Sequence, residues 1–192
     1  MTEDNAQTAA EATRAAVVAT VAAGCEQRFV AGQPVGPKKT LLNLERIIVQ
    51  DPYYHDRLAY NGLAEIVEWD GARMRDDHVT WIRLAIAREY GPQFGAAEMQ
   101  DVLVQVARQR TYHPVARYLE SVLWDNVPRI DGFLSDYLGV EDTPLTRSIS
   151  RRWFVSCVAR AMGRGLKPVK VDSVLILAGP QGAFKSTAFR VL

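Results

Sequence analysis

The stretch from Val171 to Leu192 constrains the fold of this chain more than any other. It reads VDSVLILAGPQGAFKSTAFRVL, which is an apolar run, a turn containing glycine, and Lys-Ser-Thr at the start of a predicted helix. A strand, a loop and a helix in this order form a phosphate-binding P-loop, because the loop N–H groups and the positive end of the helix converge on one anion. The stretch therefore predicts a phosphate site at the start of an α/β nucleotide-binding core.

The loop residues have the chemistry that such a site needs. Gly179 would allow a sharp exit from the predicted strand, and Gly182 would let the backbone approach phosphate oxygens. Lys185 would place an ammonium group on the β- and γ-phosphates, and Ser186 would offer a hydroxyl to Mg²⁺. The predicted nucleotide-binding residues are Gly179, Gln181, Gly182, Ala183, Phe184, Lys185, Ser186 and Thr187, with Ser186 as the metal contact.

Phe184 departs from the P-loop consensus GxxxxGK[ST], which has glycine immediately before lysine. If the residue at this position must adopt a positive φ, phenylalanine would be strained there by roughly 1–2 kcal/mol. The bare pattern of Gly179, Lys185 and Ser186 is weak. Its position between an apolar run, Val174–Leu177, and a predicted helix strengthens it.

Composition excludes several classes of protein. With 192 residues and 48% hydrophobic residues the chain can bury a core, and 23 basic against 22 acidic residues give no strong overall field. No apolar run approaches the roughly 18 residues of a membrane span, and the acidic start Met1–Asp4 is unlike a secretory signal, so we expect a cytoplasmic protein without a membrane partner. Cys25 and Cys157 are too few for a disulfide framework and are interpreted as packing residues.

The predicted fold is mainly α-helical with a small β-hairpin (α+β), followed by the first strand, loop and helix of a P-loop ATPase core. An Ala-rich helix or flexible tail with a linker, Gly32–Lys39, would occupy residues 1–39. A small α+β domain is expected at 40–110, a helical domain at 111–166, and the start of the ATPase domain at 167–192.

Within the α+β domain, apolar spacing and turn residues predict four elements. These are a helix over 40–50 with Thr40 as its N-cap, a hairpin of 57–60 with 65–69 around Asn61-Gly62, a helix with Asp76 or Asp77 as its N-cap that Gly91-Pro92 ends, and a helix from 96 to about 110. Glu65, Glu68 and Asp70 are predicted on the solvent face of the hairpin. The arrangement is vaguely like a winged helix, which is a likeness of fold only.

The helical domain is predicted to contain a helix from Pro114, a short helix over 131–138, and a long helix that begins at Thr143-Pro144 and ends near Gly163 to Gly165. The residues predicted to face inward on the long helix are Ile149, Trp153, Phe154, Cys157, Val158 and Ala161. All four tryptophans, Trp69, Trp81, Trp124 and Trp153, are interpreted as core residues. Arg147, Arg151 and Arg152 fall on the opposite face and are either solvated or available to phosphates.

A set of short motifs in order along the chain resembles one known family. They are His113-Pro114-Val115, Tyr118-Leu119, Leu123-Trp124-Asp125, Val127-Pro128-Arg129, Tyr137-Leu138-Gly139, Asp142-Thr143-Pro144, Val158-Ala159-Arg160-Ala161-Met162, Lys170-Val171-Asp172, Gly179-Pro180-Gln181-Gly182 and Lys185-Ser186-Thr187. They resemble the virulence-associated E family, phage- and island-encoded proteins similar to primase-associated, superfamily 3-like helicases. The resemblance is clearest over roughly the last 80 residues.

The resemblance implies a part in phage or mobile-element DNA replication. The family's loop is similar to GxQGxxKS[T], in which the position before lysine is less strictly glycine. The resemblance implies that Lys185 and Ser186 contact the nucleotide. The implied cofactors are ATP and Mg²⁺, and the implied partners are DNA and further copies of the chain in an oligomeric ring.

No catalytic residue is assigned within the chain, and whether it is an enzyme is left open. An ATPase of this kind needs an acidic Walker B strand, a sensor residue and an arginine finger, and none precedes Leu192. We therefore expect a truncated chain or one part of a split protein that binds ATP weakly if at all. The alternatives are a non-catalytic DNA-binding or partner-docking module over residues 40 to 165, or a degenerate remnant.

Overall fold

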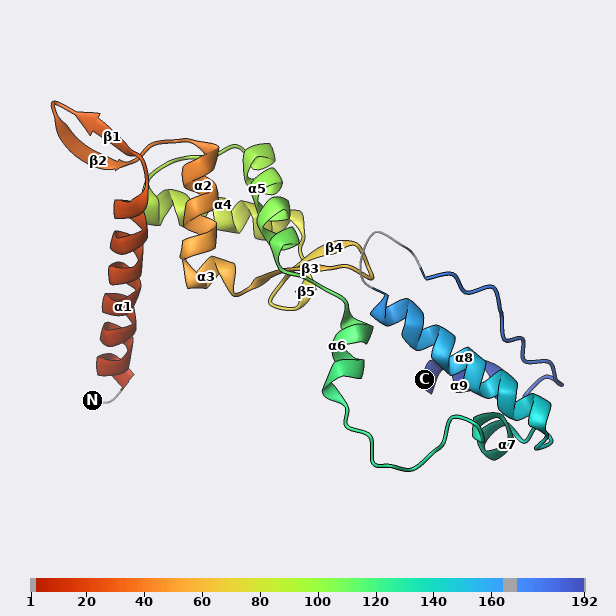
Figure 1. The fold of residues 1–192 in the computed structure, drawn as a ribbon. Coiled ribbons are helices and arrows are strands. Elements are labelled where there is room, and N and C mark those ends of the chain that lie inside the picture. Colours follow the sequence, from red (N-terminus) through yellow and green to blue (C-terminus); the bar gives the residue numbers. More distant parts are fainter. Residues whose placement is uncertain (1–2, 164–168, 192) are drawn as a thin grey trace. The chain divides into compact units, whose positions relative to one another are not determined.

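The computed structural model describes residues 3–163 and 169–191, and the chain divides into two compact units, Met1–Pro114 and Val115–Leu192 (Figure 1). Each unit combines helices with turns or strands of its own, and the chain has the predicted α+β character. None of the helices in the described ranges is long and apolar enough to cross a membrane. The finer division into four segments stays a prediction.

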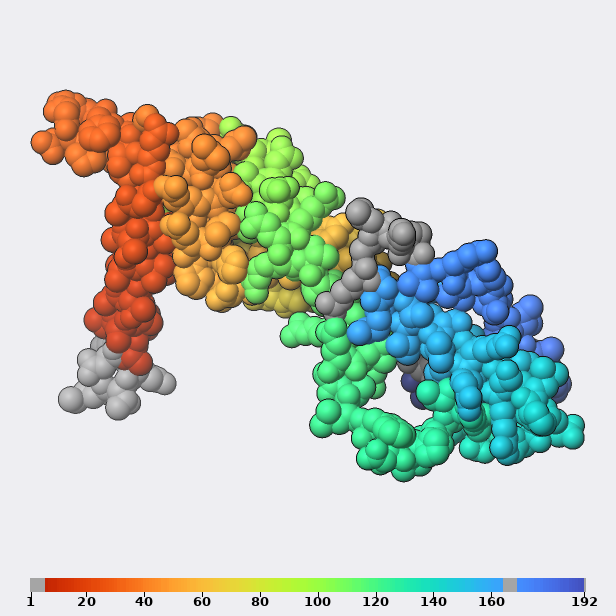
Figure 2. All heavy atoms as spheres, viewed as in Figure 1, coloured from red at the N-terminus to blue at the C-terminus, as the bar shows by residue number. Residues whose placement is uncertain are grey.

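Unit 1 begins with helix α1 (Glu3–Gly24), which packs Val21 into the core. Strands β1 (Gln27–Val30) and β2 (Gln33–Pro37) then form an antiparallel hairpin, so that part of the predicted linker is a strand. The two turn residues, Ala31 and Gly32, have φ values of 51° and 79°. Two positive φ values match the twist of a tight hairpin. Figure 2 shows this hairpin as a protrusion beside the end of α1.

The next helices follow the apolar spacing of the sequence. Helix α2 (Leu41–Gln50) begins as predicted, with the Thr40 side chain accepting a hydrogen bond from the Asn43 N–H. It ends at Asp51, where Pro52 opens the short helix α3 (Pro52–His55). Since Pro52 lacks an N–H and fixes φ, the chain starts a new turn there instead of continuing α2.

Unit 1 also contains a four-stranded sheet in the order β5-β4-β3-β6. Its strands are β3 (Leu58–Asn61), β4 (Ile66–Trp69), β5 (Ala72–Arg73) and β6 (Thr111–Tyr112). Strands β3 and β4 confirm the predicted hairpin, and β6 adds to β3 in parallel. The turn lies one residue later than predicted, because Asn61 still pairs with Ile66. The Asn61 side-chain oxygen accepts hydrogen bonds from the N–H groups of Leu63 and Ala64 in that turn.

Helices α4 (Asp76–Tyr90) and α5 (Ala96–Gln109) complete the unit, and α5 packs against α2 and β3. The N-cap of α4 is Arg75 instead of either predicted aspartate, and Asp76 and Asp77 lie in the first turn, where negative charge favours the helix dipole. The residues of the core with no more than 1% exposure are Leu44, Ile47, Ile48, Tyr54, Leu58, Ile82, Ile86, Met99, Leu103, Val106 and Ala107.

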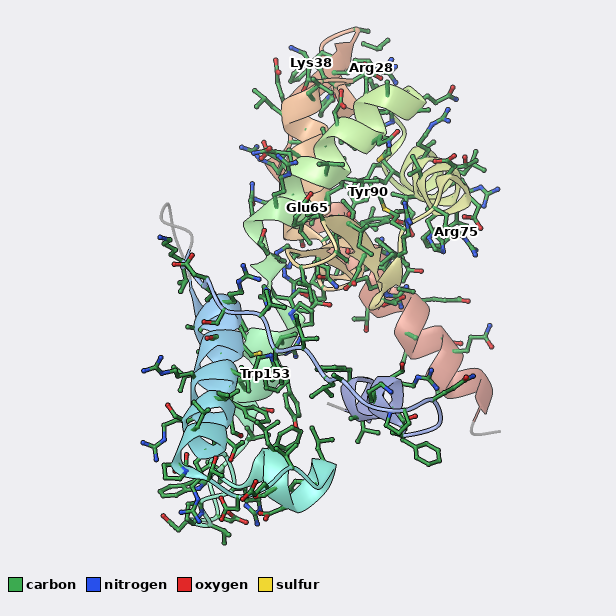
Figure 3. All side chains as sticks on the ribbon, turned by 90° about the vertical axis from the view of Figure 1, so that its right-hand side faces the viewer. Arg28, Lys38, Glu65, Arg75, Tyr90 and Trp153 are labelled. Carbon is green, nitrogen blue, oxygen red and sulfur yellow. The ribbon has the colours of Figure 1, made fainter. Side chains whose placement is uncertain are left out.

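One charged network joins three helices of unit 1. The fully buried carboxylate of Asp51 accepts hydrogen bonds from Arg14 Nη1 on α1 at 2.6 Å and from the Tyr90 hydroxyl on α4 at 2.7 Å. Arg14 Nη2 also reaches Glu89 at 2.5 Å, and Glu89 accepts a hydrogen bond from Tyr54. Figure 3 labels Tyr90 on its helix. Burial and the hydrogen bond to Asp51 raise the pKa of Tyr90, so its hydroxyl remains a donor at neutral pH.

The position of Glu68 contradicts one prediction about the hairpin. Its side chain is buried and not on the solvent face, and its carboxylate accepts hydrogen bonds from Asn61 at 2.9 Å and from the Tyr112 hydroxyl at 2.6 Å. Tyr112 arrives on β6, which pairs with β3. The added strand therefore covers this face and supplies the donor that makes burial of Glu68 tolerable.

Unit 2 has the predicted helices. They are α6 (Pro114–Ser121), which begins at the last residue of unit 1, α7 (Phe133–Leu138), α8 (Pro144–Met162) and α9 (Lys185–Val191). Helix α7 ends at Gly139 with a φ of 66°, and Thr143 caps α8 by accepting from the Thr146 N–H. Ring contacts join α7, α8 and α9, and the aromatic residues involved are Phe133, Tyr137, Trp153, Phe154 and Phe189. Figure 3 labels Trp153 on α8.

Several residues predicted to be buried are exposed. On α8, Cys157 is exposed and Ile149 and Val158 are about 40% exposed, since this helix contacts its described neighbours mainly through the aromatic residues around Trp153. Trp124 is 71% exposed and is not a core anchor. In unit 1, Trp81 is 44% exposed and contacts the rings of Tyr53 and Trp69, whereas Trp69 is buried as predicted.

The predicted strand Val174–Leu177 is not a strand in this structure. Val174 and Ile176 are 84% and 81% exposed, and residues 169–180 pair with no strand among the described residues. A strand exists only through the hydrogen bonds of a neighbour, so an apolar run alone does not form one. The β-branched residues favour an extended backbone, but no strand among the described residues pairs with it.

We predict that Asp51→Ala lowers the free energy of unfolding by about 3 kcal/mol, because it leaves Arg14 and the Tyr90 hydroxyl without their shared partner. Urea unfolding followed by circular dichroism measures the change. The matched control is Asp101→Ala, which removes an exposed carboxylate from α5 and should change stability by no more than about 0.5 kcal/mol. Equal losses in the two variants would contradict a stabilising role for the network.

Candidate phosphate-binding site

The loop before α9 has the backbone conformation of a tight turn that feeds a helix. Gly182 has a φ of 85° and Phe184 has a φ of 52°. The Phe184 carbonyl accepts hydrogen bonds from the N–H groups of Thr187 and Ala188, each at 3.0 Å, so the helix starts immediately after it. The predicted order of loop and helix is thus confirmed, and the first N–H groups of α9 open toward the loop.

Lys185 folds back over the loop. Its ammonium Nζ donates to the Gly179 carbonyl at 2.8 Å and to the Pro180 carbonyl at 2.7 Å. These two bonds span the loop and place the positive charge of the first helical residue beside the turn. An incoming anion would meet an ammonium group that is fixed there. The anion would compete with two neutral carbonyls for the hydrogen bonds of that group.

The two loop glycines differ in what requires them. Gly182 has open space around the position of a Cβ, so its positive φ, and not its surroundings, favours glycine. A Cβ on Gly179 would meet only the Lys185 side chain, at an ordinary distance of 3.9 Å. The structure therefore gives a conformational reason for glycine at 182 and none at 179.

Phe184 adopts the positive φ that the sequence analysis considered. This left-handed conformation costs a residue with a Cβ roughly 1–2 kcal/mol. The ring is 79% exposed and so recovers little of that cost by burial. Phe184 therefore keeps, directly before α9, a backbone conformation that a residue with a Cβ disfavours.

The other predicted site residues lie on an open surface. Gln181, Ala183, Ser186 and Thr187 are exposed, and Lys185 is half-buried. The side chains of Gln181 and Ser186 form no hydrogen bond with the described part of the chain, so both are free to meet a ligand. The loop thus brings together one ammonium, a hydroxyl and the N-terminal N–H groups of a short helix.

Metal binding by the protein alone has no support in the described ranges. They contain no group of three His, Cys, Asp or Glu side chains arranged to hold a metal ion. The histidines lie apart: the His55 ring contacts Asp56, and the His78 ring accepts from the Arg75 N–H at the start of α4. A divalent ion at the loop would therefore need ligands from a bound phosphate in addition to Ser186.

A family model matches part of the chain. The model of the virulence-associated protein E-like domain matches residues 119–192, which is less than half of the chain and includes the loop and α9. The match supports the resemblance seen in the sequence motifs of unit 2. The curated proteins include none that matches the chain.

Proposed function

We propose that residues 179–187 bind the phosphates of ATP together with Mg²⁺, and that the chain is part of a P-loop ATPase. The observation that carries the proposal is the position of Lys185, whose ammonium group bridges the loop carbonyls at the start of a helix. The similarity of residues 119–192 to the virulence-associated protein E-like domain supports it independently. We extend the proposal to helicase-like work in phage or mobile-element DNA replication, with DNA and further copies of the chain as partners.

The roles of the loop residues follow from their chemistry. Lys185 would exchange its two carbonyl acceptors for the charged oxygens of the β- and γ-phosphates, which form stronger hydrogen bonds. The Ser186 hydroxyl would bind Mg²⁺ held by those phosphates, and the N–H groups at the start of α9 would face the remaining negative charge. These groups bind and orient the nucleotide, and none of them is a base that activates water.

The affinity of this site should be low. Binding must break the bonds from Lys185 to Gly179 and Pro180, and the loop is exposed, so water competes for every charge interaction. The apolar segment that precedes the loop is itself unpaired among the described residues, so it does not hold the loop rigidly. We therefore expect binding in the range of about 0.1 to 1 mM.

We predict that Lys185→Ala removes Mg-ATP binding, because it deletes the cation that compensates the phosphates. Isothermal titration calorimetry on the full chain measures the loss. The control is Lys170→Ala, which removes a lysine whose visible partner is the exposed Asp172 and should leave the affinity unchanged. Wild-type affinity in the Lys185 variant would contradict the proposed site, and steady ATP turnover by the chain alone would contradict a purely binding role.

We predict that Phe184→Gly binds Mg-ATP two- to tenfold more tightly than Phe184→Ala. Both variants remove the exposed ring, but only glycine adopts a φ near 52° without the cost of a Cβ, which is roughly 1 kcal/mol. The comparison thus separates backbone strain from loss of the aromatic side chain. Equal affinities would contradict this prediction and would show that the positive φ costs the same in the free loop and in the nucleotide-bound loop.

A further inference from the structure

Positive charge is concentrated in unit 2 and on one of its helices. The sequence from Val115 to Leu192 has eleven Lys and Arg against seven Asp and Glu, although the whole chain is nearly neutral. Helix α8 contains four arginines and no acidic residue or lysine. A helix with this composition has a positive surface unless neighbouring carboxylates neutralise it.

Three of these arginines meet at a cavity. It has a volume of about 500 Å³ and is open to solvent, and its lining consists of Asp131, Pro144, Arg147, Ser148, Arg151 and Arg152. The spacing of four residues puts Arg147 beside Arg151, and Ser148 beside Arg152, on one face of α8. Five of the six side chains are charged or polar, so the cavity does not suit an apolar ligand.

Two carboxylates hold two of the guanidinium groups in place. Arg147 donates to Asp142 through Nε at 2.7 Å and through Nη2 at 2.5 Å. Arg151 donates to Asp131 through the same pair of nitrogens. These hydrogen bonds lower the pKa of both aspartates, which therefore stay ionised at neutral pH. Each Nη1 is left free to donate, and a guanidinium already held in one orientation loses less entropy when it binds an anion.

Arg152 supplies charge that no described residue neutralises. Its side chain makes no hydrogen bond or ion pair within the ranges 3–163 and 169–191, and it is exposed at the cavity. The Ser148 hydroxyl, likewise without a partner there, adds a neutral donor one helical turn away. Donors therefore exceed acceptors on this surface, which favours a ligand with several anionic oxygens.

We propose that this cavity on α8 binds the phosphodiester backbone of a nucleic acid strand. Arg147 and Arg152 lie about 7.5 Å apart along the helix axis, so the donors are spread along a line and not gathered around one phosphate. Among the described residues of the lining, Pro144 is the sole apolar side chain, so a base has no pocket there and the contacts are independent of sequence. The choice of nucleic acid rests on the proposed role in DNA replication, whereas the site itself involves no residue of the ATP loop.

The test is the binding of a fluorescein-labelled single-stranded oligonucleotide to the full chain, measured by anisotropy at several salt concentrations. Arg152→Ala should weaken binding five- to tenfold at low salt and reduce the slope of log K against log salt by about 1. The substitution removes no hydrogen bond or ion pair of the described residues, so the fold is expected to be unchanged. Circular dichroism verifies this.

Arg160→Ala is the matched control. Arg160 is exposed on the same helix, also lacks a side-chain partner among the described residues, and lies two turns, about 12 Å, from Arg152. Both variants lose one positive charge, so general attraction to the protein would weaken equally in both. The proposal expects less than a twofold change in Arg160→Ala.

Equal losses of affinity in the two variants would overturn the proposal. A lack of oligonucleotide binding at low salt would overturn it as well. Competition separates the possible sources of phosphate, since unlabelled oligonucleotide should displace the probe at far lower phosphate concentration than inorganic phosphate does. Displacement at equal phosphate concentrations would assign the cavity to single phosphate groups instead. Lys185→Ala should bind the oligonucleotide normally, so failure of the ATP site leaves this test interpretable.

Discussion

The buried carboxylate of Asp51 is the interaction on which the first unit depends. It lies where α2 gives way to α3, and it accepts hydrogen bonds from α1 and α4. A buried charge of this kind is tolerable only when its partners are fixed, and here a guanidinium and a tyrosine hydroxyl satisfy both carboxylate oxygens. Around it, α1, α2 and α4 form a connected structure with a continuous apolar core beside the network.

The second unit is organised differently. Thr143 caps α8 and Gly139 ends α7, but the buried residues of the unit are few, and ring contacts around Phe133 and Trp153 join its helices. Apolar side chains such as Leu123, Val174 and Ile176 remain exposed. The two candidate anion sites lie in this unit, and both depend on local geometry. One is a strained loop that leads into α9, and the other consists of arginines of α8 that nearby aspartates hold in place.

The two sites use different devices for similar ligands. At the loop, a single ammonium and a helix N-terminus face one direction, which suits a compact phosphate group. On α8, several guanidinium groups follow the helix and suit an extended chain of phosphates. The aspartates reduce the net charge of the α8 surface, and in return they fix the orientation of its donors.

Most helices could be predicted from the sequence, because their signals are local. The Thr40 and Thr143 caps, the proline at the start of α8 and the glycines after α4 and α7 act within one turn of the helix ends. The β3–β4 hairpin and the order of loop and helix at Lys185 were also evident, since apolar periodicity and turn residues specify them. The motif also raised a positive φ at Phe184 as a condition, and the structure has it.

Only the tertiary structure decided which of these residues are buried and which partners they have. The sequence placed Glu68 in water, but β6 arrives from more than 40 residues away and covers it with Tyr112. The sequence predicted a strand at Val174–Leu177, but a strand needs hydrogen bonds from a neighbouring strand, which an apolar run does not provide. It showed three arginines on one face of a helix, but the pairing of Arg151 with Asp131, which is 20 residues earlier, depends on how the chain folds back. Local sequence determined the elements, and long-range contacts determined their surroundings, because burial and pairing belong to residues distant in the chain.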